Sequence, residues 1–158
     1  MHAANTGDFH TEKLKRLNRV MTRKIDFELN NVRTMGRTQL SDHLATNPPL
    51  SRLRLNDNNL DDDDAALIAT ALKENTNLKH LSLNGNDFTD AGRITLENAV
   101  HDRTSLSSMS ESNHTCIIFG AGDGAQINHI YPRAREAAMR KKKIYRLLST
   151  RHRSGCNV

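Results

Sequence analysis

Leucine and other apolar residues recur at a fixed interval along the middle of the chain. When a row of 28 residues starting at Leu50 is written above the next row, Leu53 aligns with Leu81 and the rest of the pattern follows. The interval extends forward to residues 106–116 and, in a degenerate form, back to residues 22–49. In this alignment it holds without insertion for about 95 residues, which predicts that one structural unit is repeated.

Each unit is predicted to open with a short strand. Leu53 and Leu55 alternate with polar residues, and side chains two positions apart lie on the same face of a strand, so these leucines should point into the core. An asparagine follows three positions later, at Asn58, Asn86 and, in the degenerate row, Asn30. Its amide is suited to bind the backbone groups of a tight bend, and stacked units would align these residues as an asparagine ladder.

A helix is predicted in the second half of each unit. Apolar residues occupy one helix face, fully in the first row at Ala65, Ile68, Ala69 and Leu72 and more weakly in the second at Ile94, Ala99 and Val100. Four aspartates, Asp61–Asp64, directly precede the first helix, where carboxylates cap the amino end and favour the helix dipole. We interpret them as capping and solvation rather than a divalent-ion site, because the spacing of a calcium loop is absent.

The pattern L-x-x-L-x-L-x-x-N-x-L, closing at 28 residues, resembles the leucine-rich repeat family, and its length resembles the ribonuclease-inhibitor-like class. The resemblance implies an α/β solenoid that forms a short horseshoe arc, with parallel strands on the concave face and helices on the convex face. The domains expected are residues 1–21 as a flank or capping helix, 22–116 as repeats (22–49 degenerate, 50–77, 78–105, and 106–116 partial), 117–131 as a glycine-rich loop and 132–158 as a basic amphipathic tail.

Polar residues that alternate with the buried leucines should form the concave surface. These residues are Lys24, Asp26 and Glu28, then Arg52, Arg54 and Asn56, then His80, Ser82 and Asn84, and finally Ser108, Ser110 and Ser112. Neighbouring strands lie about 4.8 Å apart, which would make Asp26 and Arg54 lateral neighbours. Such a face suits a protein partner, and it also suits a solvated sheet. Arg52, Arg54 and His80 are the first candidates for binding, because arginine and ring-bearing side chains often dominate binding energies.

Charge is distributed unevenly along the chain. The net charge of +5 divides into +3 for residues 1–49, −4 for 50–105, −2 for 106–130 and +8 for 131–158. The basic tail has three interpretations: a solvated or capping helix that returns over the acidic array, a contact with nucleic acid or an anionic membrane, or a partner-groove or nuclear-import segment. Its candidate phosphate-binding residues are Arg140, Lys141, Lys142, Lys143 and Arg146.

Chemistry beyond binding finds little support in the sequence. The two cysteines, Cys116 and Cys156, lie 40 positions apart without zinc-site spacing, and nucleophile-elbow, metalloprotease and P-loop motifs are absent. Glycines at 120, 122 and 124 are interpreted as a flexible loop, and His114 as the sign of a degenerating terminal repeat. We therefore expect no enzyme activity, no cofactor and no metal. The sequence also shows no membrane span or secretory signal, which predicts a cytoplasmic or nuclear protein.

The function that these features favour is a non-catalytic scaffold that binds a partner protein through the concave face. Resemblance to the repeat class implies a second possibility, regulation of a GTPase or of actin. A third possibility is attachment to nucleic acid or a membrane through the tail alone.

Overall fold

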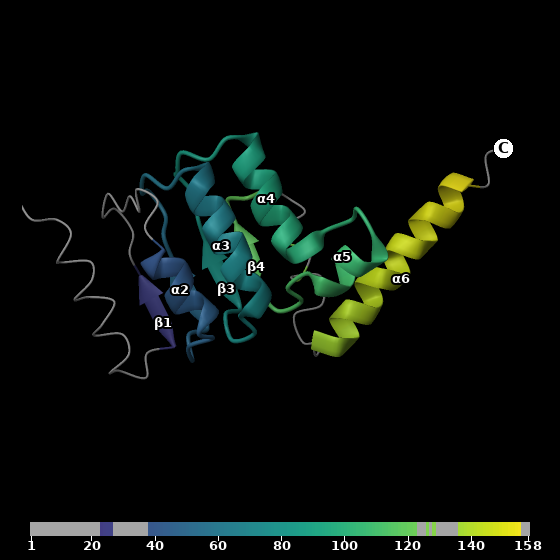
Figure 1. The fold of residues 1–158 in the computed structure, drawn as a ribbon, viewed down its shortest axis with the longest axis horizontal. Coiled ribbons are helices and arrows are strands. Elements are labelled where there is room, and N and C mark those ends of the chain that lie inside the picture. The colour runs from purple at the N-terminus through teal and green to yellow at the C-terminus, as the bar shows by residue number, and fades with distance from the viewer. Residues whose placement is uncertain (1–22, 27–37, 123–125, 127, 129–135, 156–158) are drawn as a thin grey trace, which may run out of the picture.

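Four short strands lie side by side in one parallel sheet, and helices cover one of its faces (Figure 1). The computed structural model describes residues 23–26, 38–122, 126, 128 and 136–155. The described elements, in chain order, are β1 (Lys24–Asp26), α2 (Gln39–Ala45), β2 (Arg52–Arg54), α3 (Asp62–Glu74), β3 (His80–Ser82), α4 (Asp90–His101), α5 (Leu106–Glu111), β4 (Ile117–Phe119) and α6 (Glu136–Gly155).

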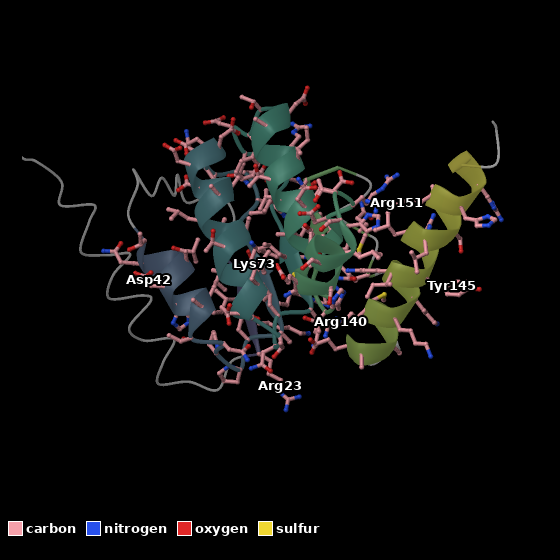
Figure 2. All side chains as sticks on the ribbon, turned by 45° about the vertical axis from the view of Figure 1, so that its right-hand side comes forward. Arg23, Asp42, Lys73, Arg140, Tyr145 and Arg151 are labelled. Atoms are coloured by element: carbon pink, nitrogen blue, oxygen red, sulfur yellow. The ribbon has the colours of Figure 1, made fainter. Side chains whose placement is uncertain are left out.

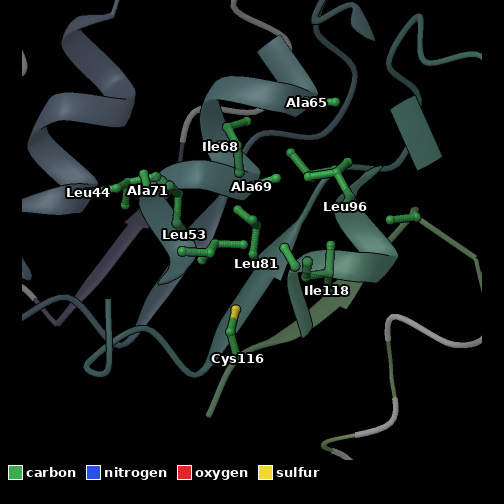
Figure 3. Packing of buried hydrophobic residues seen from close by; sticks show 14 of the residues in the cluster. Leu44, Leu53, Ala65, Ile68, Ala69, Ala71, Leu81, Leu96, Cys116 and Ile118 are labelled. Carbon is green, nitrogen blue, oxygen red and sulfur yellow. The ribbon is translucent and has the colours of Figure 1, made fainter. Parts of the chain in front are cut away.

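The predicted stacking in register is confirmed for the first three strands. The sheet order is β1-β2-β3-β4, and Ile25 pairs with Leu53, which pairs with Leu81. Leu53 and Leu81 are 1% and 0% exposed, so these side chains share one core rather than each filling a core of its own (Figure 3). Each unit is therefore stabilised by burying apolar surface against its neighbours.

The fourth unit departs from the predicted interval. Leu81 pairs with Ile118, an offset of 37 positions rather than 28, because helix α5 lies between α4 and the strand. Residues 108–112, expected as a strand with Ser108, Ser110 and Ser112 on its surface, belong to this helix and its end. The expected loop at 117–131 begins instead with strand β4.

Local sequence preferences explain this departure. The side chain of Ser105 accepts a hydrogen bond from the Ser108 amide and caps the start of α5, while Met109 is fully buried. The run Ile117-Ile118-Phe119 consists of β-branched and aromatic residues, which favour a strand. The fixed interval alone placed the fourth strand in the wrong segment.

The helices α3 and α4 pack against each other on the covered face of the sheet. The predicted stripe of α3 is buried, with Ile68 at 2% and Leu72 at 0% exposure. In α4, Ala99 and Val100 are buried as predicted, whereas Ile94 is 57% exposed and Leu96 takes the inward position. The prediction for Ile94 was wrong because that residue lies off the stripe which Leu96 shares with Ala99 and Val100.

Two sets of asparagines support the bends at either end of the strands. After the strands, Asn86 donates to the carbonyls of Leu55 and Leu83 at 2.9 and 2.8 Å and accepts from the Leu60 amide. Asn58, buried in the neighbouring unit, donates to the Asn56 carbonyl at 2.9 Å. The predicted ladder is therefore present at these two positions, and Asn30 lies outside the described residues.

A second asparagine ladder, before the strands, was not predicted. The fully buried Asn75 donates to the Leu44 carbonyl at 2.7 Å and accepts from the Leu78 amide at 2.8 Å. Asn113 repeats this pattern one unit later, donating to the carbonyls of Leu72 and Asn75 at 2.7 and 2.6 Å. These bonds join consecutive units, because each amide reaches a carbonyl of the unit before it.

The aspartate run caps two helices. Asp61 accepts from the amides of Asp63 and Asp64, and Asp64 accepts in return from the Asp61 amide at 3.1 Å. Asp62 accepts from the amide and hydroxyl of Thr89 at 2.9 and 2.5 Å, at the start of α4. The capping interpretation is confirmed, and Asp62 extends it to the next unit.

Candidate functional site

The sheet face opposite α3 and α4, called the uncovered face below because no described helix packs on it, carries two lateral rows of side chains. Strand register places Lys24, Arg52 and His80 in one row, which ends at Ile117. The second row runs Asp26, Arg54, Ser82 and Phe119. Because side chains along a strand alternate between faces, both rows lie opposite the buried leucines. The sheet thus brings the predicted residues of β1, β2 and β3 together on one surface.

The lateral contact between Asp26 and Arg54 was predicted and is confirmed. Arg54 Nη1 lies 3.4 Å from Asp26 Oδ2, and the two side chains are 48% and 54% exposed. An ion pair that exposed contributes at most about 1 kcal/mol to stability. Its main effect here is to offset the charge of Arg54, so that Lys24 and Arg52 carry the positive charge of the first row.

At the carboxyl ends of β2 and β3, three polar side chains bind one another. Asn56 Oδ1 accepts from Ser82 Oγ at 2.7 Å and from the Asn84 amide at 3.0 Å, and Asn84 Nδ2 also donates to Ser82 Oγ at 3.2 Å. These hydrogen bonds hold the three side chains in place at the edge of the uncovered face. Many of their donors and acceptors are therefore already paired with one another. Glu28, the remaining predicted member of this surface, lies outside the described residues.

Apolar side chains stand where the sequence predicted serines. Ile117 and Phe119 occupy the β4 positions of the two rows, and the ring of Phe119 stacks on His80 with centroids 6.4 Å apart and planes 16° apart. Phe119 is half-buried and Ile117 is 5% exposed. Sequence reasoning missed both residues, although the Ile-Ile-Phe run could have signalled a strand.

The tail forms a helix that packs against α5 and the end of α4, as Figure 1 shows. Met139 and Leu147 are buried at 2% and 8% exposure. Lys143 lies between them on the docked face, 3% exposed, and its Nζ donates to the carbonyl of Val100 and, at 3.0 Å, to that of Asn113. The interpretation of the tail as a helix returning to the array fits this packing, although the contact is with its end.

Two arginines of the tail also form hydrogen bonds with the array. Arg140 donates to Ser110 Oγ at 2.7 Å through Nε, and Arg151 donates to the Thr104 carbonyl at 2.8 Å. Of the five predicted phosphate-binding residues, Lys143 is therefore buried and bonded, and Arg140 is bonded while remaining exposed. Lys141, Lys142 and Arg146 are exposed.

Titratable groups cluster where α6 meets the array. Burial lowers the pKa of Lys143 to about 7. Burial, reinforced by the charge of Lys143, lowers the pKa of His101 and of His114 to about 4. Nδ1 of each histidine is buried, and it has no hydrogen-bond partner among the described residues. His114 was interpreted as a degenerate position of the ladder that follows the strands, but it precedes β4 and lies next to Asn113 of the second ladder.

Cys116, the cysteine that the structure describes, is buried and is not activated as a nucleophile. Burial raises the pKa of the Cys116 thiol to about 12, which leaves it protonated at neutral pH. In the described ranges no group of three His, Cys, Asp or Glu side chains is placed to hold a metal ion. Gly120 has φ of +92°, and a Cβ there would lie 2.7 Å from the backbone nitrogen of Asn84. A glycine is therefore needed at this position, because two chain segments approach each other closely.

Comparison with known proteins matches two segments, residues 46–69 and 74–96, to the Leucine Rich repeat family. No curated protein and no solved structure matches the chain. The matched segments cover β2 with most of α3 and β3 with half of α4. With the open parallel sheet, they confirm the predicted fold class, an α/β leucine-rich repeat solenoid. Across the part of the chain that the structure describes, no helix is long and apolar enough to cross a membrane.

Proposed function

We propose that this chain is a non-catalytic scaffold that binds a partner protein through the uncovered face of the sheet. Leucine-rich repeats generally mediate protein–protein interaction. The observation that carries the proposal is the first lateral row, in which Lys24, Arg52 and His80 follow one another across three strands. Solenoids of this kind use extended surfaces rather than single pockets to bind their partners.

The charges on this face favour a partner segment that carries carboxylates. Arg54 is offset by Asp26, so the row of Lys24 and Arg52 presents net positive charge to a ligand. Arginine forms bidentate hydrogen bonds with a carboxylate, and its contacts often dominate interface energies. Beside this row, the half-buried ring of Phe119 adds apolar surface. We infer that the partner presents an acidic segment with an apolar residue placed toward β4.

Membership of this chain in the ribonuclease-inhibitor-like class remains a prediction.

The proposal is tested by charge reversal on the sheet face. Partners captured from a lysate by the full chain are identified, and their affinity is then measured by calorimetry for the variant K24E/R52E and for the control K73E, on the exposed side of α3. We expect the double variant to weaken binding by tenfold or more, since each reversal converts an attraction to a repulsion worth about 1 kcal/mol or more at a partly desolvated site. The control should bind as the parent does.

Two outcomes would contradict this assignment. One is equal loss of binding in K73E, which would indicate general attraction to the basic chain. The other is loss of binding only when exposed cations of α6 are replaced, which would move the binding site to the tail helix.

A further inference from the structure

Helix α6 presents two different faces. One face is docked, with Met139, Lys143 and Leu147 spaced four residues apart and buried against the array. The face roughly opposite carries Ala137, Ile144, Tyr145 and Leu148, which line one shallow surface together with Lys141. A helix that needed only to cap the array would require the first of these faces and not the second.

The outer face exposes more apolar surface than a solvated helix needs. Tyr145 is 72% exposed and Leu148 is 46% exposed, two of the four large hydrophobic side chains exposed among the described residues. Figure 2 shows Tyr145 pointing away from the rest of the protein, on the side of α6 opposite Arg140 and Arg151. Isolated exposed leucines are ordinary, but large apolar side chains exposed on successive turns of one helix face mark a contact surface.

Cations lie along both edges of this stripe. Arg140 and Arg151 share the edge nearest α5, where each also donates a hydrogen bond to the array. Lys142, Arg146 and Arg153 line the other edge and share one surface with His101. The helix carries a single carboxylate, Glu136, so its field is positive along its whole length.

We propose that α6 is an interfacial helix that docks this protein on an anionic lipid bilayer, with Ile144, Tyr145 and Leu148 entering the boundary between headgroups and acyl chains. A bilayer provides an apolar layer bordered on both sides of the helix by phosphates, and this matches an apolar stripe with cations on both edges. Tyrosine suits this depth because its ring is apolar and its hydroxyl is polar.

Other partners fit the helix less well. A nucleic acid would be held by the cations alone and would leave Tyr145 and Leu148 in water. A partner helix would need carboxylates along both of its edges to match the two lines of cations. The stripe from Ala137 to Leu148 extends only about 16 Å along the helix, which agrees with lying in the interface rather than crossing it.

The docked face makes this attachment compatible with the rest of the protein. Because Met139, Lys143 and Leu147 are already held by the array, α6 is folded and oriented before it meets a membrane. The entropy of helix formation is therefore not lost at the moment of binding, as it is for a peptide that folds on the surface. In Figure 1, α6 and β1 lie at opposite ends of the array, so α6 is remote from the first strand of the proposed binding face.

The test uses the full chain and vesicles of phosphatidylcholine with and without phosphatidylserine, separated by flotation. We expect binding only to the anionic vesicles. I144S/L148S should weaken it by tenfold or more through lost apolar burial, and R146Q/R153Q by about fivefold for each cation removed. The control substitutions lie on α4: I94S removes an isoleucine that is 57% exposed, and R93Q removes an exposed cation. Both controls should bind as the parent does.

A second measurement follows the stripe directly. The chain has no tryptophan, so Y145W introduces a single tryptophan whose emission should shift to the blue when anionic vesicles are added. Equal binding to neutral vesicles, or I144S/L148S binding as tightly as the parent, would overturn the proposal. So would an unshifted Y145W emission in vesicle-bound protein, or a stripe that is already covered in solution by a second copy, detected as a dimer that I144S/L148S dissociates.

Discussion

The side chain of Asn113 forms hydrogen bonds with four backbone groups. Its amide nitrogen serves the carbonyls of Leu72 and Asn75, and its oxygen accepts from the amides of Thr115 and Cys116 at 2.8 and 2.7 Å. All these partners belong to chain segments that turn in or near the core. A buried backbone group without a partner costs about 1 to 3 kcal/mol, so one amide here prevents several such losses.

We therefore predict that N113A lowers the free energy of unfolding by about 4 kcal/mol. The measurement is chemical denaturation followed by circular dichroism. N98A, at an exposed position of α4, is the matched control and should change stability by no more than about 0.5 kcal/mol. Similar losses in the two variants would contradict the role assigned to Asn113.

Lys143 and its two histidine neighbours make the docking of α6 sensitive to pH. The groups facing this cluster are all cationic or neutral: Arg103 near His101, Arg140 near His114, and the protonated thiol of Cys116. No carboxylate is among the groups that shift the pKa of Lys143, His101 or His114. Protonation of either histidine thus adds a positive charge to a site that already holds one.

The sign of the pH dependence follows from these lowered pKa values. Between pH 6.5 and about 4 the unfolded chain binds protons at His101 and His114 that the folded chain does not, so the stability linked to these two histidines is fully present above pH 6.5 and is lost as the pH falls toward 4. The lowered pKa of Lys143 acts in the same direction between pH 10.5 and about 7.

We predict that the denaturation midpoint falls when the pH is lowered from 6.5 to 4.5, and that H101Q/H114Q removes most of this dependence. Glutamine keeps a donor and an acceptor but does not titrate in this range. His43, which lies in α2 away from α6, provides the control variant H43Q, and the pH dependence should persist in it. An unchanged slope in H101Q/H114Q would assign the dependence to other groups.

At the scale of elements, the turn after β4 shows how closely adjacent units approach. Gly120 and Gly122 share the same φ of +92°, but a Cβ at Gly120 would meet the backbone of Asn84 at 2.7 Å, whereas one at Gly122 would meet only Glu97 Oε2 at 3.6 Å. Substitutions at these two positions therefore allow the free-energy cost of a left-handed backbone to be measured apart from the cost of a backbone clash.

G122A is expected to cost about 1 to 2 kcal/mol, which is the penalty of the left-handed conformation alone. G120A should cost clearly more, because the turn must also move away from β3 to relieve the contact. Thermal denaturation of the two variants side by side makes the comparison. Equal losses would mean that β4 can shift without cost and that its register is not fixed by this turn.

The elements also show how far the sequence could predict the fold. Leu53 and Leu81 repeat at the interval of the unit, so the stacking of β1, β2 and β3 was predictable from periodicity. Strand β4 was not, because α5 adds nine positions and an interval carries no signal of an insertion. Lys143 illustrates a second limit: charge counting placed it on the surface, whereas tertiary contacts bury it beside two carbonyls.

At the scale of the whole molecule, the array behaves as a row of units coupled to their neighbours. The core residues Leu44, Leu53, Leu81 and Ile118 come from α2, β2, β3 and β4 and form one buried cluster (Figure 3). Removing a side chain from a central unit withdraws contacts from the units on both sides. In a single closed core, the lost contacts would not be confined to the adjacent units.

We predict that L81A lowers the free energy of unfolding by about 2 to 5 kcal/mol, while I25A at the end of the described sheet, where the side chain is half-buried, costs less. Hydrogen exchange measured by mass spectrometry should show that L81A loosens α3 and α4 together. Loosening confined to α4 would indicate that the units fold independently.

Helix α5 enters the array without disturbing what lies on either side of it. Leu81 and Ile118 stay in register across an extra nine positions, and the ladder of Asn75 and Asn113 continues past them. The segment between α4 and β4 can therefore be longer than in the other units without changing how the strands stack. An engineer who wished to graft a recognition loop onto this scaffold would insert it within residues 102–112 and keep Thr104, Met109 and Ser110, because Met109 is buried and the other two accept hydrogen bonds from α6.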